Sequence, residues 1–195
     1  MRLSILRDAK FHGLLLRYDH YVAGDAKKAG CSECGGVLHV AHFPRKPRGI
    51  VPVGLPPEYE RRDSFCCARD GCRSRHTPAS LRFLGRKVYF GAVVVLVSAM
   101  RHGITAARLN KLSQVVGVSR RTLERWRDWW QEAFPGTPFW RVTSASFMPP
   151  VRVAQLPASL LERLGGGERM RLPRCLRFLG PISGGASATQ AVRGW

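Results

Sequence analysis

Hydrophobic and polar positions follow different patterns in successive parts of this chain. In residues 1–28 the apolar positions, among them Leu3, Phe11 and Leu16, are spaced too irregularly to define a helix. This segment therefore predicts only a short strand or a helical lead-in. From about residue 29 the pattern changes to short apolar runs interrupted by Gly and Pro. In this part "GGVLHVAHF" alternates as a strand does, and "PRKPRGIVPVGLPPEYERR" predicts an extended, Pro-rich connection.

Residues 86–134 have the pattern of consecutive helices. The apolar run "VYFGAVVVLVSAM" is shorter than the ~20 residues that span a bilayer, so it predicts a buried helix, with an interfacial helix as the alternative. Gly103 can end this helix and Thr105 can begin the next. A break at residues 117–119 precedes a third helix. Three helices in sequence predict a small bundle.

The segment "LSQVVGVSRRTLERW" carries the spacing of a helix-turn-helix. Its apolar positions fall where two crossing helices pack, and they are Leu112, Val116, Val118, Leu123 and Trp126. Gly117 suits the turn, and Ser119 suits the N-cap of the following helix. On that helix Arg121 and Arg125 fall on the face opposite the apolar residues, and Arg120 lies at the exposed N-terminal turn. Arginines at the start of such a helix can read guanine in the major groove, although a solvated charged face is the alternative.

The remaining segment, residues 135–195, is poor in regular patterns. It predicts a Pro-rich linker, "PGTPFWRVTSASFMPP", then a short amphipathic helix, "LPASLLERL", and a short apolar piece, "RCLRFLGPI". The Gly-, Ser- and Ala-rich end is expected to be disordered.

The net charge of the chain limits the classes of partner that it is expected to bind. The 195 residues include 32 Lys and Arg against 13 Asp and Glu, a formal net charge of +19 and a pI near 11.1. A field of this sign attracts polyanions, with nucleic acid first and an anionic membrane surface second. The N-terminus lacks the apolar core and cleavage site of a secretory signal. We therefore expect a cytoplasmic, nucleoid-associated protein with no membrane partner.

Six cysteines in such a protein point to metal or thiol chemistry rather than to disulfides. Cys31 and Cys34 form one pair on a tight turn, and Cys67 and Cys72 form a second pair. Four thiolates complete the tetrahedron of a structural Zn²⁺ ion, and two such turns separated by a strand and a loop describe a zinc ribbon. Successive residues of a strand point to opposite faces, so Cys66 and Cys67 cannot both be ligands, and we favour Cys67.

Three histidines lie near these cysteines in sequence. His39 and His42 are expected on a strand face and His76 on an exposed loop, although each could replace a cysteine ligand. A redox centre is less favoured, because the strand and helix context of that motif is missing. "CSECGGVLHVAHF" is also similar to treble-clef nucleases, in which a histidine activates water beside a metal. The downstream Asn and His that such enzymes need are not evident.

The stretch "FCCARDGCRSRHTPASLRFLGRKVYFGAVVVLVSAMRHGITAARLNKLSQVVGVSRRTLERW" resembles the N-terminal region of bacterial insertion-sequence transposases. Those proteins combine a zinc ribbon, a "GRK"-like basic step, a long apolar helix and a "GVS" helix-turn-helix. The resemblance covers residues 31–134. It implies zinc ligands at Cys31, Cys34, Cys67 and Cys72. It also implies a DNA-reading helix bearing Ser119, Arg120, Arg121 and Arg125.

The chain departs from that family after residue 134. The transposases continue into a catalytic domain with three carboxylates, whereas the acidic residues here are only Glu162 and Glu168. The predicted fold class is therefore α+β. The lead-in (1–28) precedes a small β zinc ribbon (29–85) and a three-helix helix-turn-helix domain (86–134), followed by a Pro-rich linker with short helices and a partly disordered tail (135–195).

These observations predict a non-catalytic, sequence-specific DNA-binding protein, an accessory or regulator related to transposases. Arg69, Arg73 and Arg75 would contact phosphates, and the helix-turn-helix would read bases. Double-stranded DNA is favoured, although a zinc ribbon with arginines also suits single strands or RNA. The alternatives are a metal-dependent nuclease of the treble-clef type and an adaptor that binds a separately encoded transposase or another protein.

Overall fold

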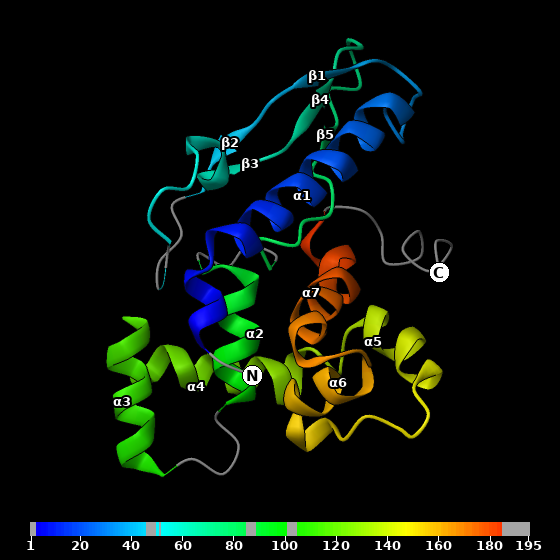
Figure 1. Ribbon diagram of the computed structural model, residues 1–195. Coiled ribbons are helices and arrows are strands. Elements are labelled where there is room, and N and C mark those ends of the chain that lie inside the picture. Colours follow the sequence, from blue (N-terminus) through cyan, green and yellow to red (C-terminus); the bar gives the residue numbers. More distant parts are fainter. Residues whose placement is uncertain (1–2, 46–49, 51, 85–88, 101–104, 185–195) are drawn as a thin grey trace.

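The structure is a computed structural model that describes residues 3–45, 50, 52–84, 89–100 and 105–184. These residues form an α+β fold in which a small β region lies at one end of a helical body (Figure 1). The predicted fold class is therefore confirmed at this level. The helices are α1 (Ala9–Ala29), α2 (Gly91–Ala99), α3 (Ala106–Val116), α4 (Arg120–Asp128), α5 (Pro138–Thr143), α6 (Ala158–Arg163) and α7 (Glu168–Leu179). The strands are β1 (Leu38–Val40), β2 (Phe43–Pro44), β3 (Arg61–Arg62), β4 (Phe65–Cys67) and β5 (Arg75–His76).

The N-terminal segment is a long helix, so the expected short strand was wrong and the alternative of a helical lead-in was right in type but too short. Asp8 caps α1 by accepting a hydrogen bond from the backbone N–H of Lys10 at 2.9 Å. The helix ends at Gly30, whose φ of 79° suits glycine. Phe11 and Leu15 bury one face of α1 in the helical core, and Ala23 packs further along against the β region. One helix therefore connects both parts of the molecule.

Two small antiparallel sheets make up the β region. β1, β4 and β5 form a three-stranded sheet with β4 in the centre, and Leu38 pairs with Cys67. β2 and β3 form a second, two-stranded sheet in which Phe43 pairs with Arg62. The alternating "GGVLHVAHF" pattern thus corresponds to strands β1 and β2. The second sheet takes up part of the long connection between the two cysteine pairs.

Helix α2 occupies the centre of the helical body. Its side chains from Ala92 to Val97 are fully buried, as the apolar run "VYFGAVVVLVSAM" predicts. α4 and α7 both pack against it. Within the described residues, no helix combines the length and the apolar character that crossing a membrane requires. The predicted cap at Gly103 lies outside the described residues.

Helices α3 and α4 are joined by a three-residue turn at Gly117, Val118 and Ser119. Gly117 has a φ of 69°, a conformation that side chains with a Cβ rarely adopt. Ser113 donates to the Val118 carbonyl, and the Val118 N–H returns to the Ser113 carbonyl at 3.1 Å. Ser119 caps α4 by accepting from the Thr122 N–H at 3.2 Å. These contacts fix the angle between the two helices.

The C-terminal part is packed into the body of the protein. The predicted Pro-rich linker contains α5, which Thr137 caps and whose Phe139 and Trp140 are buried in the main core. The expectation of a linker was therefore wrong over these residues. The short apolar piece belongs to α7, whose Leu176 and Leu179 lie in the same core. The Gly-, Ser- and Ala-rich end from residue 185 lies outside the described residues.

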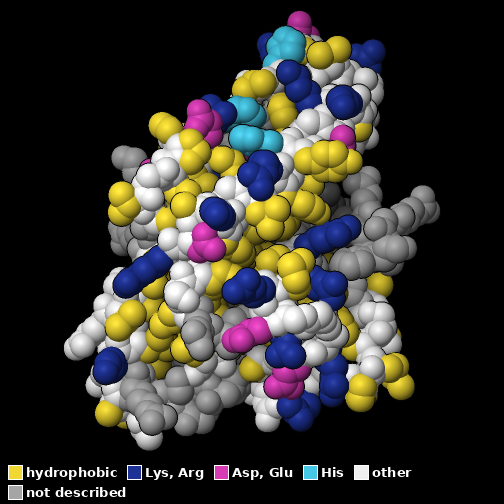
Figure 2. All heavy atoms as spheres, in the orientation of Figure 1, with side chains coloured by type: hydrophobic (Ala, Val, Ile, Leu, Met, Phe, Trp, Pro, Cys, Tyr) yellow, Lys and Arg dark blue, Asp and Glu magenta, His cyan; other side chains and the backbone are white. Residues whose placement is uncertain are grey.

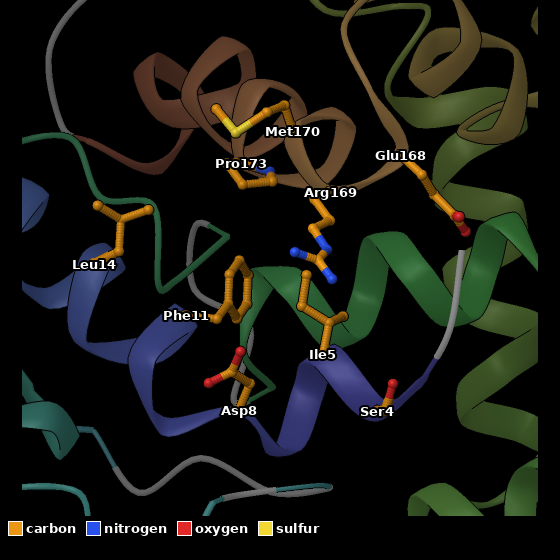
Figure 3. A pocket seen from close by; sticks show the side chains of 9 residues that line it. All are labelled: Ser4, Ile5, Asp8, Phe11, Leu14, Glu168, Arg169, Met170 and Pro173. Atoms are coloured by element: carbon orange, nitrogen blue, oxygen red, sulfur yellow. The ribbon is translucent and has the colours of Figure 1, made fainter.

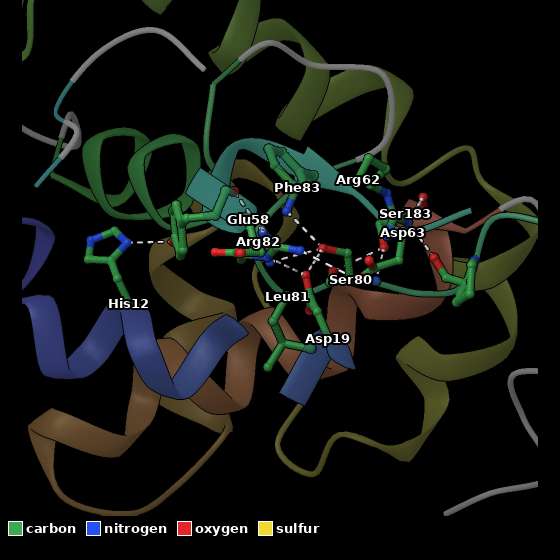
Figure 4. Close-up of polar contacts among 12 residues, drawn as sticks. His12, Asp19, Glu58, Arg62, Asp63, Ser80, Leu81, Arg82, Phe83 and Ser183 are labelled. Atoms are coloured by element: carbon green, nitrogen blue, oxygen red, sulfur yellow. Dashed lines mark hydrogen bonds and ion pairs between the residues drawn. The ribbon is translucent and has the colours of Figure 1, made fainter. Parts of the chain in front are cut away.

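A buried polar network joins the β region to the helices (Figure 4). Asp19 of α1 accepts hydrogen bonds from the Leu81 N–H, from Ser80 and from Arg82. Arg62 of β3 donates to the carbonyls of Pro78 and Ser183. Buried charges are costly unless they are paired in this way. The network therefore holds the segments that flank β4 and β5 against α1 and the C-terminal helices.

Candidate metal centre and nucleic-acid interface

Two tight turns place four cysteines together at the end of the three-stranded sheet. In the first turn the Gly35 N–H donates to the Cys31 carbonyl at 2.8 Å, and the Cys31 N–H donates to the Gly36 carbonyl at 2.9 Å. A Cβ on Gly36 would lie 3.1 Å from the Cys67 Sγ, so glycine leaves room for the sulfur. The second turn runs from Cys67 to Cys72 and closes with the Cys72 N–H on the Arg69 carbonyl at 3.2 Å.

The four sulfurs have the spacing that one metal ion requires. Sγ of Cys31, Cys34, Cys67 and Cys72 all lie within 4.8 Å of one another. The Sγ atoms of Cys31 and Cys72 are 3.7 Å apart, and those of Cys34 and Cys67 are 3.5 Å apart. In a tetrahedron with Zn–S bonds of about 2.3 Å, adjacent sulfurs are separated by about 3.8 Å. The cluster is therefore compatible with a metal such as zinc, and the predicted set of four cysteines is brought together.

Cys66 points away from this cluster. Its sulfur lies 3.4 Å from the Arg73 carbonyl, while the neighbouring Cys67 is fully buried among the other three thiols. The two residues are successive positions of β4, so they face opposite sides of the sheet. The choice of Cys67 over Cys66 as the member of the cluster is confirmed.

Hydrogen bonds to the sulfurs change the acidity of the thiols. Ser74, whose hydroxyl lies 3.3 Å from Cys72 Sγ, and the neighbouring Cys34 and Cys31 thiols together lower the pKa of Cys72 to about 6. The Arg69 N–H, 3.4 Å from Cys67 Sγ, lowers the pKa of Cys67, but burial and the neighbouring thiols together raise it to about 12. Four thiols this close cannot all ionise alone, and a bound cation would supply the missing positive charge.

His76 lies beside the cluster and not on an exposed loop as expected. It belongs to β5, is half-buried, and places Nε2 3.2 Å from the Cys31 sulfur. This contact suits a hydrogen bond to a Cys31 thiolate, which would orient that ligand. His39 is exposed on β1. The position of His76 beside Cys31 could not be predicted from the cysteine spacing, because only the pairing of β4 with β5 brings His76 to this place.

His42 has a hydrogen bond that bears on the nuclease alternative. The Ser64 N–H donates to His42 Nδ1 at 3.1 Å, so the proton of the neutral ring lies on Nε2. Asp63 Oδ1 is 3.7 Å from Nδ1, which is too far for a hydrogen bond. With Nε2 protonated, His42 has no free ring nitrogen to ligate a metal or to accept a proton from water. The geometry therefore does not favour His42 as a nuclease base.

The three arginines predicted to contact phosphates have different surroundings. Arg69 is exposed and donates to the Cys34 carbonyl at 3.3 Å. Arg73 is exposed and lies 3.3 Å from Asp70, itself almost fully exposed. Arg75 donates to the Ser64 hydroxyl and to the Ala41 carbonyl, and its guanidinium stacks 5.2 Å above the Phe43 ring. Arg69 and Arg73 therefore have more freedom to reach a ligand than Arg75.

Helix α4 presents its basic residues to solvent. Leu123, Trp126 and the following Trp130 are buried in the main core, as the apolar spacing predicts. The N-cap Ser119 and Arg120 in the first turn are exposed, as are Arg121 and Arg125 on the face opposite the apolar residues. Arg120 pairs with Glu124 at 3.0 Å, one turn further along the helix. Trp129 is half-buried against Trp130 and Phe134, so it is only partly available for stacking on a base.

An open cavity of about 790 Å³ lies between the start of α1 and α7 (Figure 3). Ile5, Phe11, Met170 and Pro173 are among its lining residues, together with Asp8 and Glu168. Asp8 is already engaged as the N-cap of α1. The two carboxylates therefore do not form a free acid–base pair.

Comparisons of this chain with models of protein families, with curated proteins and with solved structures returned no match.

Proposed function

We propose that this chain is a non-catalytic, sequence-specific DNA-binding protein built from a zinc ribbon and a helix-turn-helix. The zinc ribbon comprises the four-cysteine cluster and its sheet, and α3 and α4 form the helix-turn-helix. The observation that carries the proposal is the start of α4, where Ser119, Arg120 and Arg121 are exposed while Leu123 and Trp126 are buried. A recognition helix inserts these N-terminal residues into the major groove.

The metal centre supports this role indirectly. A zinc ion held by Cys31, Cys34, Cys67 and Cys72 would be closed to further ligands, as in structural sites. Its function would then be to hold the two cysteine turns together. The exposed Arg69 and Arg73 on the second turn would contact phosphates, which position a protein on DNA without reading its sequence.

The C-terminal helices support a role without catalysis. Glu162 pairs with Arg152 at 3.2 Å, and Glu168 lines the open cavity beside α1. α7 packs on α2 as part of the main core. In the part of the chain that the structure describes, no three carboxylates converge as strand transfer requires, and this supports the proposal of an accessory protein or regulator related to transposases.

The proposal can be tested by selecting bound duplexes from a random DNA library and measuring affinity for the best sequence. Replacing Arg121 with Ala should relax the preference at one base pair by ~1–3 kcal/mol, because a bidentate contact to guanine is lost. Arg127→Ala is the matched control, since Arg127 is exposed near the end of the same helix beside Asp128.

Two results would contradict this function. One is the absence of any preferred sequence. The other is duplex affinity that does not change between 50 and 200 mM salt, where six or more phosphate contacts predict a loss of ~10³-fold or greater.

A further inference from the structure

We propose that the solvent face of α1 is a second, sequence-independent contact for the backbone of duplex DNA. This inference rests on the proposed DNA-binding function but concerns a helix with no part in reading bases. The face, which we call the α1 stripe, consists of positions spaced alternately four and three residues apart. They are Lys10, Leu14, Arg17, Tyr21, Gly24 and Lys28.

Apart from the half-buried Gly24, the positions of the α1 stripe are exposed along the helix. Lys10, Arg17 and Lys28 are exposed, and Leu14 and Tyr21 have exposed fractions of 45% and 69%. At a rise of 1.5 Å per residue, the three cations extend over about 27 Å, the length of roughly eight base pairs. Dark-blue Lys and Arg side chains recur along the diagonal that α1 follows (Figures 1 and 2).

The charges of the stripe are not neutralised within the protein. Among the described residues, no ion pair or side-chain hydrogen bond to an acidic group involves Lys10, Arg17 or Lys28. No position of the stripe is acidic, and Asp25 lies at its edge. Three aligned, unpaired cations on a protein of net charge +19 complement a polyphosphate backbone.

Two glycines on this side of α1 also point to close approach by a partner. Gly13 and Gly24 lie inside the helix, where each costs about 1 kcal/mol relative to Ala. No contact among the described residues requires them: a Cβ at Gly24 would meet none of their atoms within 4 Å, and one at Gly13 would meet only the Arg17 guanidinium at 3.9 Å. Because glycine has no Cβ, a phosphate of the DNA backbone can come close to the helix at these two positions.

The metal centre fixes the position of the stripe. Ala23 of α1 packs in one cluster with Cys31, Leu38, Phe65 and Cys67. Lys28 lies three residues before Cys31, so the stripe ends beside the first cysteine turn. α1 therefore extends the basic surface of the zinc ribbon along a rigid helix.

The test compares duplex binding of the full chain with that of the triple variant Lys10→Ala, Arg17→Ala, Lys28→Ala. A labelled mixed-sequence duplex of about 30 base pairs would be titrated between 50 and 200 mM salt. Each phosphate contact contributes about 0.9 to the slope of log affinity against log salt, so the slope should fall by about 2.7. Between 50 and 200 mM salt the affinity of both proteins falls, and the factor by which it falls should be about 40 times smaller for the variant than for the original chain.

The matched control removes three exposed arginines elsewhere, with Arg141→Ala, Arg152→Ala and Arg177→Ala in one chain. Both variants lower the net charge equally, and the control should keep the original slope. An unchanged slope in the α1 variant, with Arg121→Ala still relaxing base preference, would overturn the inference and leave the proposed function intact. If the original chain showed no salt-dependent binding to the duplex, both this inference and the proposed DNA-binding function would be contradicted.

Tyr21 distinguishes a duplex partner from a single strand. The variants Tyr21→Phe and Tyr21→Ala should both bind duplex DNA with an affinity within about twofold of that of the original chain, because a backbone contact does not depend on ring stacking. Tighter binding to a single strand of equal length, weakened by Tyr21→Ala and retained by Tyr21→Phe, would overturn the duplex assignment.

Discussion

Asp19 of α1 and Arg82 form an ion pair of 2.8 Å, and both side chains are fully buried. Asp19 also accepts the Leu81 N–H at 2.7 Å, while Arg82 donates to the carbonyls of Glu58 and Tyr59. The pair thus joins α1, the segment before β3 and the segment that leads into α2. This contact sets how the metal-binding region sits on the helical core.

Replacing Asp19 with Asn should destabilise the protein by about 3 kcal/mol, because the buried Arg82 loses its nearest counter-charge and keeps only Asp63, 3.6 Å away. Urea unfolding followed by circular dichroism would measure the change in the free energy of unfolding. Asp25→Asn is the control, since Asp25 is exposed on the same helix and should shift stability by less than about 0.5 kcal/mol. Equal effects of both substitutions would show that the buried pair has no special role.

Replacing Cys67 with Ser should abolish stoichiometric zinc binding, whereas Cys66→Ser should leave it unchanged. The reason is that Cys67 is buried among three other thiols and Cys66 faces the opposite side of β4. Elemental analysis of purified protein should find about one zinc per chain for the original and for Cys66→Ser, as expected for a four-thiolate site. Loss of zinc in the Cys66 variant with retention in the Cys67 variant would reverse the assignment.

Because the folded protein holds His12 in its neutral form, the free energy of unfolding should decrease in mild acid. Burial lowers the pKa of His12 below its ordinary value of 6.5. Its Nε2 donates to the Leu6 carbonyl at 3.0 Å and its Nδ1 accepts from the Tyr59 hydroxyl at 2.5 Å, so the folded protein holds the neutral ring. Below pH 6.5 the unfolded chain binds the proton first. The stabilising contribution, complete above pH 6.5, is therefore lost as pH falls toward the lowered pKa.

The slope of this loss is at most about 1.4 kcal/mol per pH unit for one proton. Urea unfolding at pH 7.5 and at pH 5.5 would measure it, with His12→Gln as the variant that cannot titrate. That variant should retain less of the pH dependence than His20→Gln, because His20 is exposed on the same helix. The same pH dependence in both variants would exclude His12 as its source.

Alanine should have opposite effects at two glycines. At Gly117, with φ of 69°, Ala should cost about 1–2 kcal/mol because a Cβ is strained in the left-handed conformation. At Gly24, inside α1 with no atom within 4 Å of a Cβ, Ala should stabilise the protein by up to about 1 kcal/mol. Thermal unfolding of both variants checks the two signs. Stabilisation at Gly117 would mean that the turn between α3 and α4 can adopt another backbone conformation.

The sequence by itself determined the features that depend on short spacings. Two pairs of cysteines, each within six residues, were enough to predict the cluster, whereas the structure decided that Cys67, and not Cys66, belongs to it. The buried helix α2 was also predicted, because its apolar run is unbroken, and the inward face of α4 was predicted from helical periodicity. Within each cysteine pair and on each helix face the residues lie a few positions apart, whereas the two pairs are brought together only by the folded sheet.

Only the tertiary structure showed that residues 9–29 form the helix α1, that the C-terminal helices pack in the main core, and that His76 lies beside Cys31. The buried face of α1 includes His12 and Asp19, while the apolar Leu14 faces solvent, so the hydrophobic pattern does not show the helix. Asp19 is tolerated in the interior because Arg82, 63 residues away, neutralises it. Such long-range pairing leaves no trace in local spacing, since burial of a charge depends on partners that only the folded chain brings together.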